Sequence, residues 1–291
     1  MLKGILAVFF GAASYGILST IAKLSYKKGF DAEDATVFQI LFGLLVLIVL
    51  HFLQKEKTRF SDLKKSDWLA LIFGGATIAL TSLFYYSCVQ FIPASIGIIL
   101  LFQFIWIGFL LDFLFNKKKP NLFQMLALAV LIAGTFFAAG GLQAFDGSTL
   151  NSQGLILGLL SALCYASYIF INGRLKSEIS PVSKSMIMMA VSSVIVLIIL
   201  GSSLHEVAFF DTKFLIYGVP LALFGAVIPP ILFAYGVPKI GVTFSSILSS
   251  VELPVAVIVS ILLLHESVSA VQWVGIILIL SAILIVSLLK K

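Results

Sequence analysis

Residues 241–264 read GVTFSSILSSVELPVAVIVSILLL, an apolar run with a single charged residue, Glu252, near its middle. A helix needs about 20 mostly apolar residues to cross the hydrocarbon core of a bilayer, so this run is long enough to span a membrane. A charged carboxylate at that depth is costly unless it is paired, hydrated or protonated. The stretch therefore predicts a membrane-spanning helix that carries a functional acid.

The composition of the whole chain has the same character. Of its 291 residues, 60% are hydrophobic and only 11% are charged, and the mean hydropathy is +1.15. Soluble domains average about 25% charged residues, which argues against a soluble enzyme, a nucleic-acid-binding protein and a disordered chain. We assign the net charge of +6 to basic loops that face anionic lipid.

Ten stretches of the chain are long and apolar enough to be membrane spans, and alternating strand patterns are absent. We therefore expect an all-α membrane protein with ten transmembrane helices and no transmembrane barrel. The connections are short and leave no room for a domain outside the membrane. The expected spans are residues 3–25, 34–53, 67–91, 94–115, 121–141, 154–175, 182–203, 212–235, 241–264 and 268–289.

The basic residues predict the orientation of these spans. The 19 Lys and Arg residues divide 15 to 4 between the two alternating sets of loops, and the richer set includes both ends of the chain. Because cytoplasmic loops carry the excess of Lys and Arg, both termini are expected to be cytoplasmic. The predominance of lysine over arginine and the lack of a targeting extension favour a multi-pass protein of a bacterial plasma membrane.

An internal repeat divides the chain into residues 1–150 and 151–291. Sliding the sequence by 150 residues places Gly4 on Gly154 and Tyr15 on Tyr165. A slide of 148 residues aligns the later spans. Each half holds five spans, and this odd number makes the second half enter the membrane from the opposite side. Such inverted repeats place a substrate site near the midplane between the halves.

The second half contains a set of short motifs along its last spans, in the order Gly241-Val242-Thr243, Glu252-Leu253-Pro254, His265-Glu266 and Gln272-Trp273-Val274-Gly275. Together with the 5 + 5 arrangement, they resemble the drug/metabolite transporter superfamily, in particular its EamA-type exporters. The first half departs from the pattern, because Phe104, Trp106 and Lys118 stand where the second half has Glu252, Pro254 and Glu266.

Glu252 is the leading candidate for a functional residue. One hypothesis is that it takes up and releases a proton during transport, or that it contacts a cationic group of the substrate. The alternative is that it stays neutral, or bonds to a hydroxyl such as Ser249 or Ser250, and only fixes the packing of the helices.

Several aromatic residues are candidates for lining a substrate path. Tyr15 and Tyr165 occupy equivalent positions in the two halves, and Tyr85 and Trp106 lie in the intervening spans. A tyrosine at membrane depth requires a partner for its hydroxyl, which favours an interior cavity. The alternative is that these residues pack the core, belong to the interfacial aromatic belt or, for Trp106, face lipid.

Three prolines within predicted spans are candidate hinges. Pro254, Pro229 and Pro230 lack an N–H and free the carbonyls of residues 250, 225 and 226. They are interpreted as flexing points of a gate, or alternatively as static kinks that neighbouring helices absorb. Lys23 and Asp112 lie near span ends and are expected to reach the membrane interface.

The function expected from these observations is secondary active transport of a small neutral or zwitterionic metabolite, with export as the direction. The resemblance implies amino acids, their derivatives or drug-like organics as substrates. No P-loop and no metal-ligand spacing of histidines occurs, so no cofactor, metal or enzymatic activity is expected. The alternatives are a membrane-embedded enzyme acting on lipid-linked substrates, and a flippase or channel on the same fold. The expected partners are the substrate and membrane lipid, not nucleic acid, with a homodimer as a candidate assembly.

Overall fold

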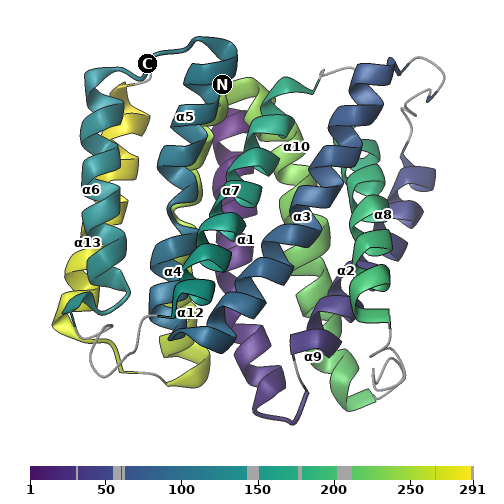
Figure 1. Ribbon diagram of the computed structural model, residues 1–291, viewed down its shortest axis with the longest axis horizontal. Helices are drawn as coiled ribbons and strands as arrows, with labels where there is room; N and C mark the ends of the chain where they lie inside the picture. The colour runs from purple at the N-terminus through teal and green to yellow at the C-terminus, as the bar shows by residue number, and fades with distance from the viewer. Residues whose placement is uncertain are drawn as a thin grey trace.

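The computed structural model describes residues 1–30, 32–54, 60, 63–142, 151–175, 179–201, 212–265 and 267–289. Within these ranges every regular element is a helix (Figure 1). The helices are α1 (Leu2–Tyr26), α2 (Ala32–Leu53), α3 (Lys65–Phe91), α4 (Ala94–Leu101), α5 (Phe104–Asn116), α6 (Leu122–Ala138), α7 (Ser152–Arg174), α8 (Pro181–Leu200), α9 (Thr212–Ala222), the π-helix η4 (Leu223–Val227), α10 (Ile228–Ile240), α11 (Val242–Ser249), α12 (Glu252–Leu264) and α13 (Ala270–Leu289).

The expectation of an all-helical membrane protein is confirmed. Eight helical stretches of the described chain are long and apolar enough to cross a membrane, counting α4–α5, the α9–α10 segment and α11–α12 as one stretch each. Two shorter apolar helices, Leu122–Ala138 and Ala270–Val286, lie where the remaining two spans were expected. Each of the ten predicted stretches thus coincides with a helix or with a broken helix.

Two of the expected spans are not continuous helices. The span predicted over 94–115 breaks at Phe102 and Gln103, and the span over 241–264 breaks at Ser250 and Val251. At the first break the Gln103 side chain donates to the carbonyl of Ile99 (2.8 Å), which satisfies a backbone group that the interrupted helix leaves free.

The two broken helices correspond residue by residue. The bounds of α4 and α5 fall on those of α11 and α12 when the numbering is shifted by 148 residues. The residues that end α5 and α12, Lys117 and His265, both adopt the left-handed conformation, with φ of 55° and 54°. Phe104 therefore begins α5 as Glu252 begins α12, so the carboxyl of Glu252 lies at the break.

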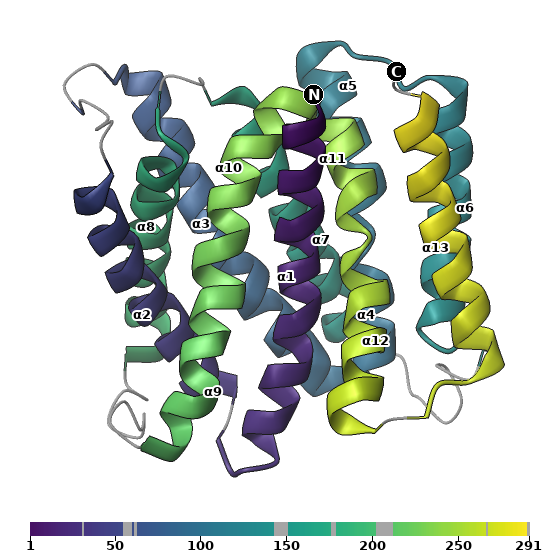
Figure 2. The same ribbon diagram turned by 180° about the vertical axis from the view of Figure 1, so that it is seen from behind.

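Helices from the two halves of the chain interleave. α1 packs against α10, α11 and α12 of the second half, while α7 packs against α3, α4 and α5 of the first half. The α6–α13 pair and the α2–α8 pair stand at the two ends of the long axis, with α1 and α7 between them (Figures 1 and 2).

Glycines permit two equivalent close contacts in this arrangement. A Cβ atom on Gly4 would lie 2.9 Å from the side chain of Ile240, and one on Gly154 would lie 2.7 Å from that of Ile92. Ile92 and Ile240 are themselves 148 residues apart. Small residues at helix crossings let backbones approach closely in a membrane, and here the same device recurs in both halves.

Candidate functional site

The carboxyl of Glu252 lies where α12 meets α1 and α7. The Tyr165 hydroxyl, on α7, donates a hydrogen bond to Glu252 Oε2 at 3.4 Å. On the α1 side, a Cβ atom on Gly16 would lie 2.5 Å from the Glu252 carbonyl oxygen, so the backbones of α1 and α12 are in direct contact. The acid is therefore held at a junction of three helices that come from both halves of the chain.

Five rings surround this junction and form an aromatic cluster. Tyr165 lies edge-on to Tyr15, with ring centroids 6.1 Å apart, and its ring is 4.6 Å from that of Phe104. Phe233 stacks on Tyr15 at 6.1 Å and meets Tyr168 edge-on at 6.0 Å. The structure thus brings together Tyr15 and Tyr165, which the sequence repeat placed at equivalent positions, and adds Tyr168 and two phenylalanine rings, Phe104 and Phe233, that the sequence did not point to as lining residues.

The two remaining aromatic candidates lie differently. Tyr85 lies on α3, and its ring contacts that of Tyr86 with centroids 6.0 Å apart. Trp106 is 37% exposed, and its indole N–H donates to Gln103 Oε1 at 2.9 Å. Trp106 is therefore oriented by a residue at the break of its own span and does not belong to the aromatic cluster.

The serines suggested as alternative partners of Glu252 donate elsewhere. The hydroxyl of Ser249 donates to the carbonyl of Ser245 (2.8 Å), and that of Ser250 donates to the carbonyl of Ile247 (2.6 Å). Both donors are therefore used within their own helical segment.

The three prolines that were predicted as hinges lie in the first turns of α12 and α10. Pro254 is the third residue of α12, a position where the missing N–H costs little, and the Ser250 carbonyl accepts from the Leu253 amide at 3.3 Å. Pro229 and Pro230 are buried in the first turn of α10, whose first residue, Ile228, follows η4 directly. The carbonyl expected to be free at residue 250 is thus occupied, while the distortion expected upstream of Pro229 takes the form of a π-helix.

The comparison with protein families decides the class of this molecule. The model of the EamA-like transporter family matches residues 2–140 and, a second time, residues 152–288. The two matches together cover nearly the whole chain. The chain belongs to the EamA-like transporter family. It is a multi-pass membrane transporter of the drug/metabolite class, and not an enzyme.

Curated relatives agree with the assignment to the EamA family. The threonine/homoserine exporter RhtA of Salmonella typhimurium (strain SL1344) is 27% identical over 254 residues, which cover 86% of this chain and 80% of the exporter. The uncharacterized inner membrane transporter YicL of S. typhimurium (strain LT2) is 26% identical over 289 residues, covering 98% and 95%. One solved crystal structure shares the fold with a TM-score of 0.80 at 14% identity, covering 97% of this chain and 98% of that chain.

Two charged residues of this EamA protein lie where the sequence did not place them. Asp112, expected at the membrane interface, is 2% exposed, and it accepts hydrogen bonds from Thr243 on α11 and from Asn116. Lys184, counted among the loop cations, is 1% exposed in the first turn of α8, with its Nζ 3.5 Å from the Leu175 carbonyl. Hydropathy alone carries no signal for either placement, because both residues lie close to span ends.

The described residues also offer few groups for other chemistry. Among them no group of three or more His, Cys, Asp or Glu side chains could hold a metal ion. Cys88 is buried, Cys164 is half-buried, and both are free thiols. Glu266, the terminal glutamate of the family motif, lies outside the described residues.

Proposed function

We propose that this EamA protein is a secondary active transporter that exports a small neutral or zwitterionic metabolite, an amino acid or a derivative. The site of transport is the Glu252 carboxyl with the phenols of Tyr15 and Tyr165, and Tyr85 and Trp106 border the path. Pro254, Pro229 and Pro230 mark the segments that flex as the site changes sides.

The observation that carries this proposal is the 3.4 Å contact between Tyr165 and Glu252 inside the aromatic cluster. A single acid among these rings provides one negative charge, phenol hydroxyls and apolar ring faces. That set suits the ammonium group and the carbon skeleton of an amino acid, because cations bind both carboxylates and ring faces. It also suits a proton, which the carboxyl takes up when the substrate leaves.

The class of substrate is supported by the relatives. RhtA of S. typhimurium and its counterpart in Escherichia coli K12, which is 26% identical to this chain, are named threonine/homoserine exporters. Threonine and homoserine are small zwitterions with one hydroxyl group. A phenol and a carboxylate at one junction are matched to such a molecule.

The mechanism proposed is alternating access between two inverted repeats. It is supported by the equivalent bounds of α4–α5 and α11–α12 and by the equivalent contacts of Gly4 and Gly154. It is also supported by the course of the chain, because α1 begins on the face that carries the N-terminus and α7 begins on the opposite face (Figure 1). Inverted repeats of this kind exchange conformations to open one side at a time.

The proposed setting is a bacterial plasma membrane with both termini in the cytoplasm, as the 15 to 4 division of basic residues favours. Reporter fusions to the two ends test it, since a reporter that is active only outside the cytoplasm is expected to stay inactive at both. Activity of that reporter at either end would refute the proposed orientation.

The decisive experiment is counterflow in liposomes at two internal pH values. Purified protein is reconstituted into vesicles loaded with unlabelled threonine or homoserine, and uptake of the labelled amino acid is followed against empty vesicles. Saturable uptake that depends on the internal substrate and on the proton gradient is expected.

Two other outcomes would replace the proposal. Uptake that neither saturates nor responds to internal substrate would indicate a channel. Movement of fluorescent lipid between leaflets, with no exchange across a panel of amino acids and organic cations, would indicate a flippase on the same fold.

A further inference from the structure

The equivalent helices α4 and α11 differ sharply in burial. All eight residues of α11 are buried, whereas only Ile96 and Gly97 are buried in α4. α11 packs against α5, α6 and α13; α4 forms no comparable contact with the equivalent helices α12, α13 and α6, all of which lie within the described chain. One face of the molecule is therefore closed where the other face is not.

Two hydrogen bonds to Asp112, which together we call the clasp, join α5 to α11 on the closed face, the face that carries the N-terminus. Thr243 Oγ1 donates to Asp112 Oδ2 at 2.8 Å, and Asn116 Nδ2 donates to Asp112 Oδ1 at 2.7 Å. One turn deeper, a Cβ atom on Gly108 would lie 2.5 Å from the hydroxyl oxygen of Ser246, so the two helices also touch there. Hydrogen bonds to a buried carboxylate are stronger than those between neutral groups, so this contact stabilises the closed arrangement.

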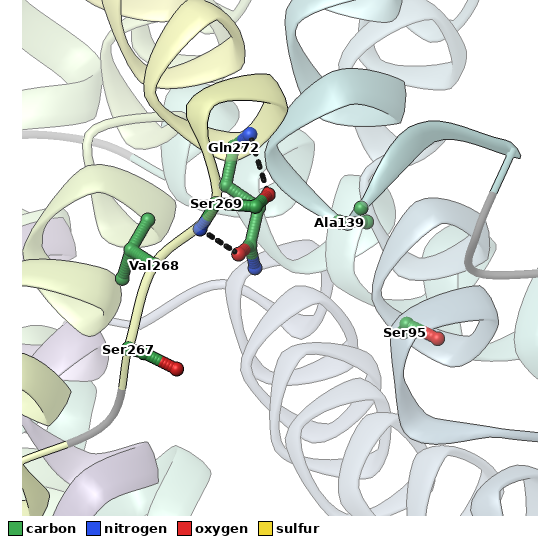
Figure 3. A pocket seen from close by; sticks show the side chains of 7 residues that line it. Ser95, Ala139, Ser267, Val268, Ser269 and Gln272 are labelled. Carbon is green, nitrogen blue, oxygen red and sulfur yellow. Dashed lines mark hydrogen bonds between the residues drawn. The ribbon is translucent and has the colours of Figure 1, made fainter.

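The equivalent positions on the opposite face form no such clasp. Ser260 stands where Asp112 stands in the first half, and its hydroxyl donates to the carbonyl of Val257 in its own helix (2.9 Å). Ser95, the counterpart of Thr243, borders a hollow of about 380 Å³. The hollow lies between the start of α4, the end of α6 and the connection from α12 to α13, where Gln272 and Ser269 bond to each other (Figure 3).

We propose that the Asp112–Thr243 hydrogen bond is a latch that keeps the N-terminal face shut while the opposite face is open, and that it breaks once in each transport cycle. The inference rests on the alternating-access mechanism proposed above. Loss of the Thr243 hydroxyl leaves the buried carboxylate with one donor fewer in the closed state, so the population shifts toward the state in which this face opens. Thr243 is thus a positioning residue for the conformational change and does not touch the substrate.

Reactivity of single cysteines toward a maleimide tests the latch in purified protein, where both faces are accessible to the reagent. Cys88 and Cys164 are replaced by Ala, and one cysteine is introduced either at Ser246, which is buried beside the clasp, or at Ser95 in the hollow. The Thr243→Val change removes the hydroxyl and keeps the shape. It is expected to raise labelling at position 246 by about tenfold, as loss of a bond to a buried charge implies, and to slow labelling at position 95.

Matched variants separate the latch from general loosening. Thr243→Ser keeps the hydroxyl and is expected to label as the parent does, and Ser260→Ala, at the counterpart of Asp112, is expected to change neither rate. Unchanged labelling in Thr243→Val with an unchanged melting temperature would overturn the inference, as would an equal rise in Ser260→Ala. Labelling requires no substrate. A failed counterflow assay would therefore refute the proposed substrate and leave the latch standing.

Discussion

The two broken helices, α4–α5 and α11–α12, share one backbone plan and carry different chemistry. In the second broken helix α12 begins with Glu252, where α5 of the first begins with Phe104. α5 carries Asp112 near its end, where α12 carries Ser260. The two equivalent segments therefore differ in where they carry an acid, one at the central break and the other near the end of α5. Segments with equivalent backbones thus differ between the two faces of the molecule through a few polar residues.

The largest effect is expected from removing the acid at the central break. Glu252→Gln keeps the shape of the side chain and abolishes its titration, so proton-driven counterflow should fall about tenfold or more. Glu33→Gln, at an exposed position of α2, is the matched control and should transport as the parent does. Full pH-dependent transport by Glu252→Gln would remove the acid from the mechanism.

The next effect concerns the contact of α1 with this break. Gly16→Ala puts a Cβ atom 2.5 Å from the Glu252 carbonyl oxygen, so α1 must shift. We expect a loss of roughly 1–3 kcal/mol in stability, seen as a lower melting temperature, together with slower counterflow. Ala166, which is buried on α7, occupies the position of the second half that is equivalent to Gly16. Ala166→Gly is expected to lower the stability by only about 1 kcal/mol. Equal effects in the two variants would contradict the close approach of α1.

A smaller effect is expected from the proline beside the acid. The first copy breaks at the same place with Trp106 where the second copy has Pro254, so the break does not depend on a proline. Pro254→Ala should therefore lower the counterflow rate by less than about threefold, since the residue occupies the first turn of α12. A tenfold loss in that assay would instead show that the proline itself, and not only the break that it borders, is needed for this segment to flex.

The smallest effect is expected at Trp106. Trp106→Phe removes the N–H that donates to Gln103 Oε1, while the amide of Gln103 still donates to Ile99. An aromatic face remains at the border of the path, so KM and maximal rate of counterflow should stay within about twofold of the parent. A large rise in KM would show that the indole N–H contacts the substrate.

Much of the fold follows from the sequence because membrane burial leaves a simple signal. Runs of about 20 apolar residues located all ten helical stretches. The repeat singled out Tyr15 and Tyr165 as equivalent residues, and the structure places their rings 6.1 Å apart. Glu252 could be singled out because a charged residue within a long apolar run has a high free-energy cost in a membrane.

The helical class, the apolar stretches and the acid within one of them could be predicted from the sequence, because hydrophobicity and residue order act locally along the chain. Three facts became visible only in the folded molecule. α1 packs against helices of the second half and α7 against helices of the first half, and Phe104 and Phe233 join the aromatic cluster. Asp112 is buried and hydrogen-bonded to Thr243. These facts depend on which helices pack together, and apolar surfaces specify burial without specifying a neighbour. A hydrogen bond between residues 131 positions apart exists only once that packing is set.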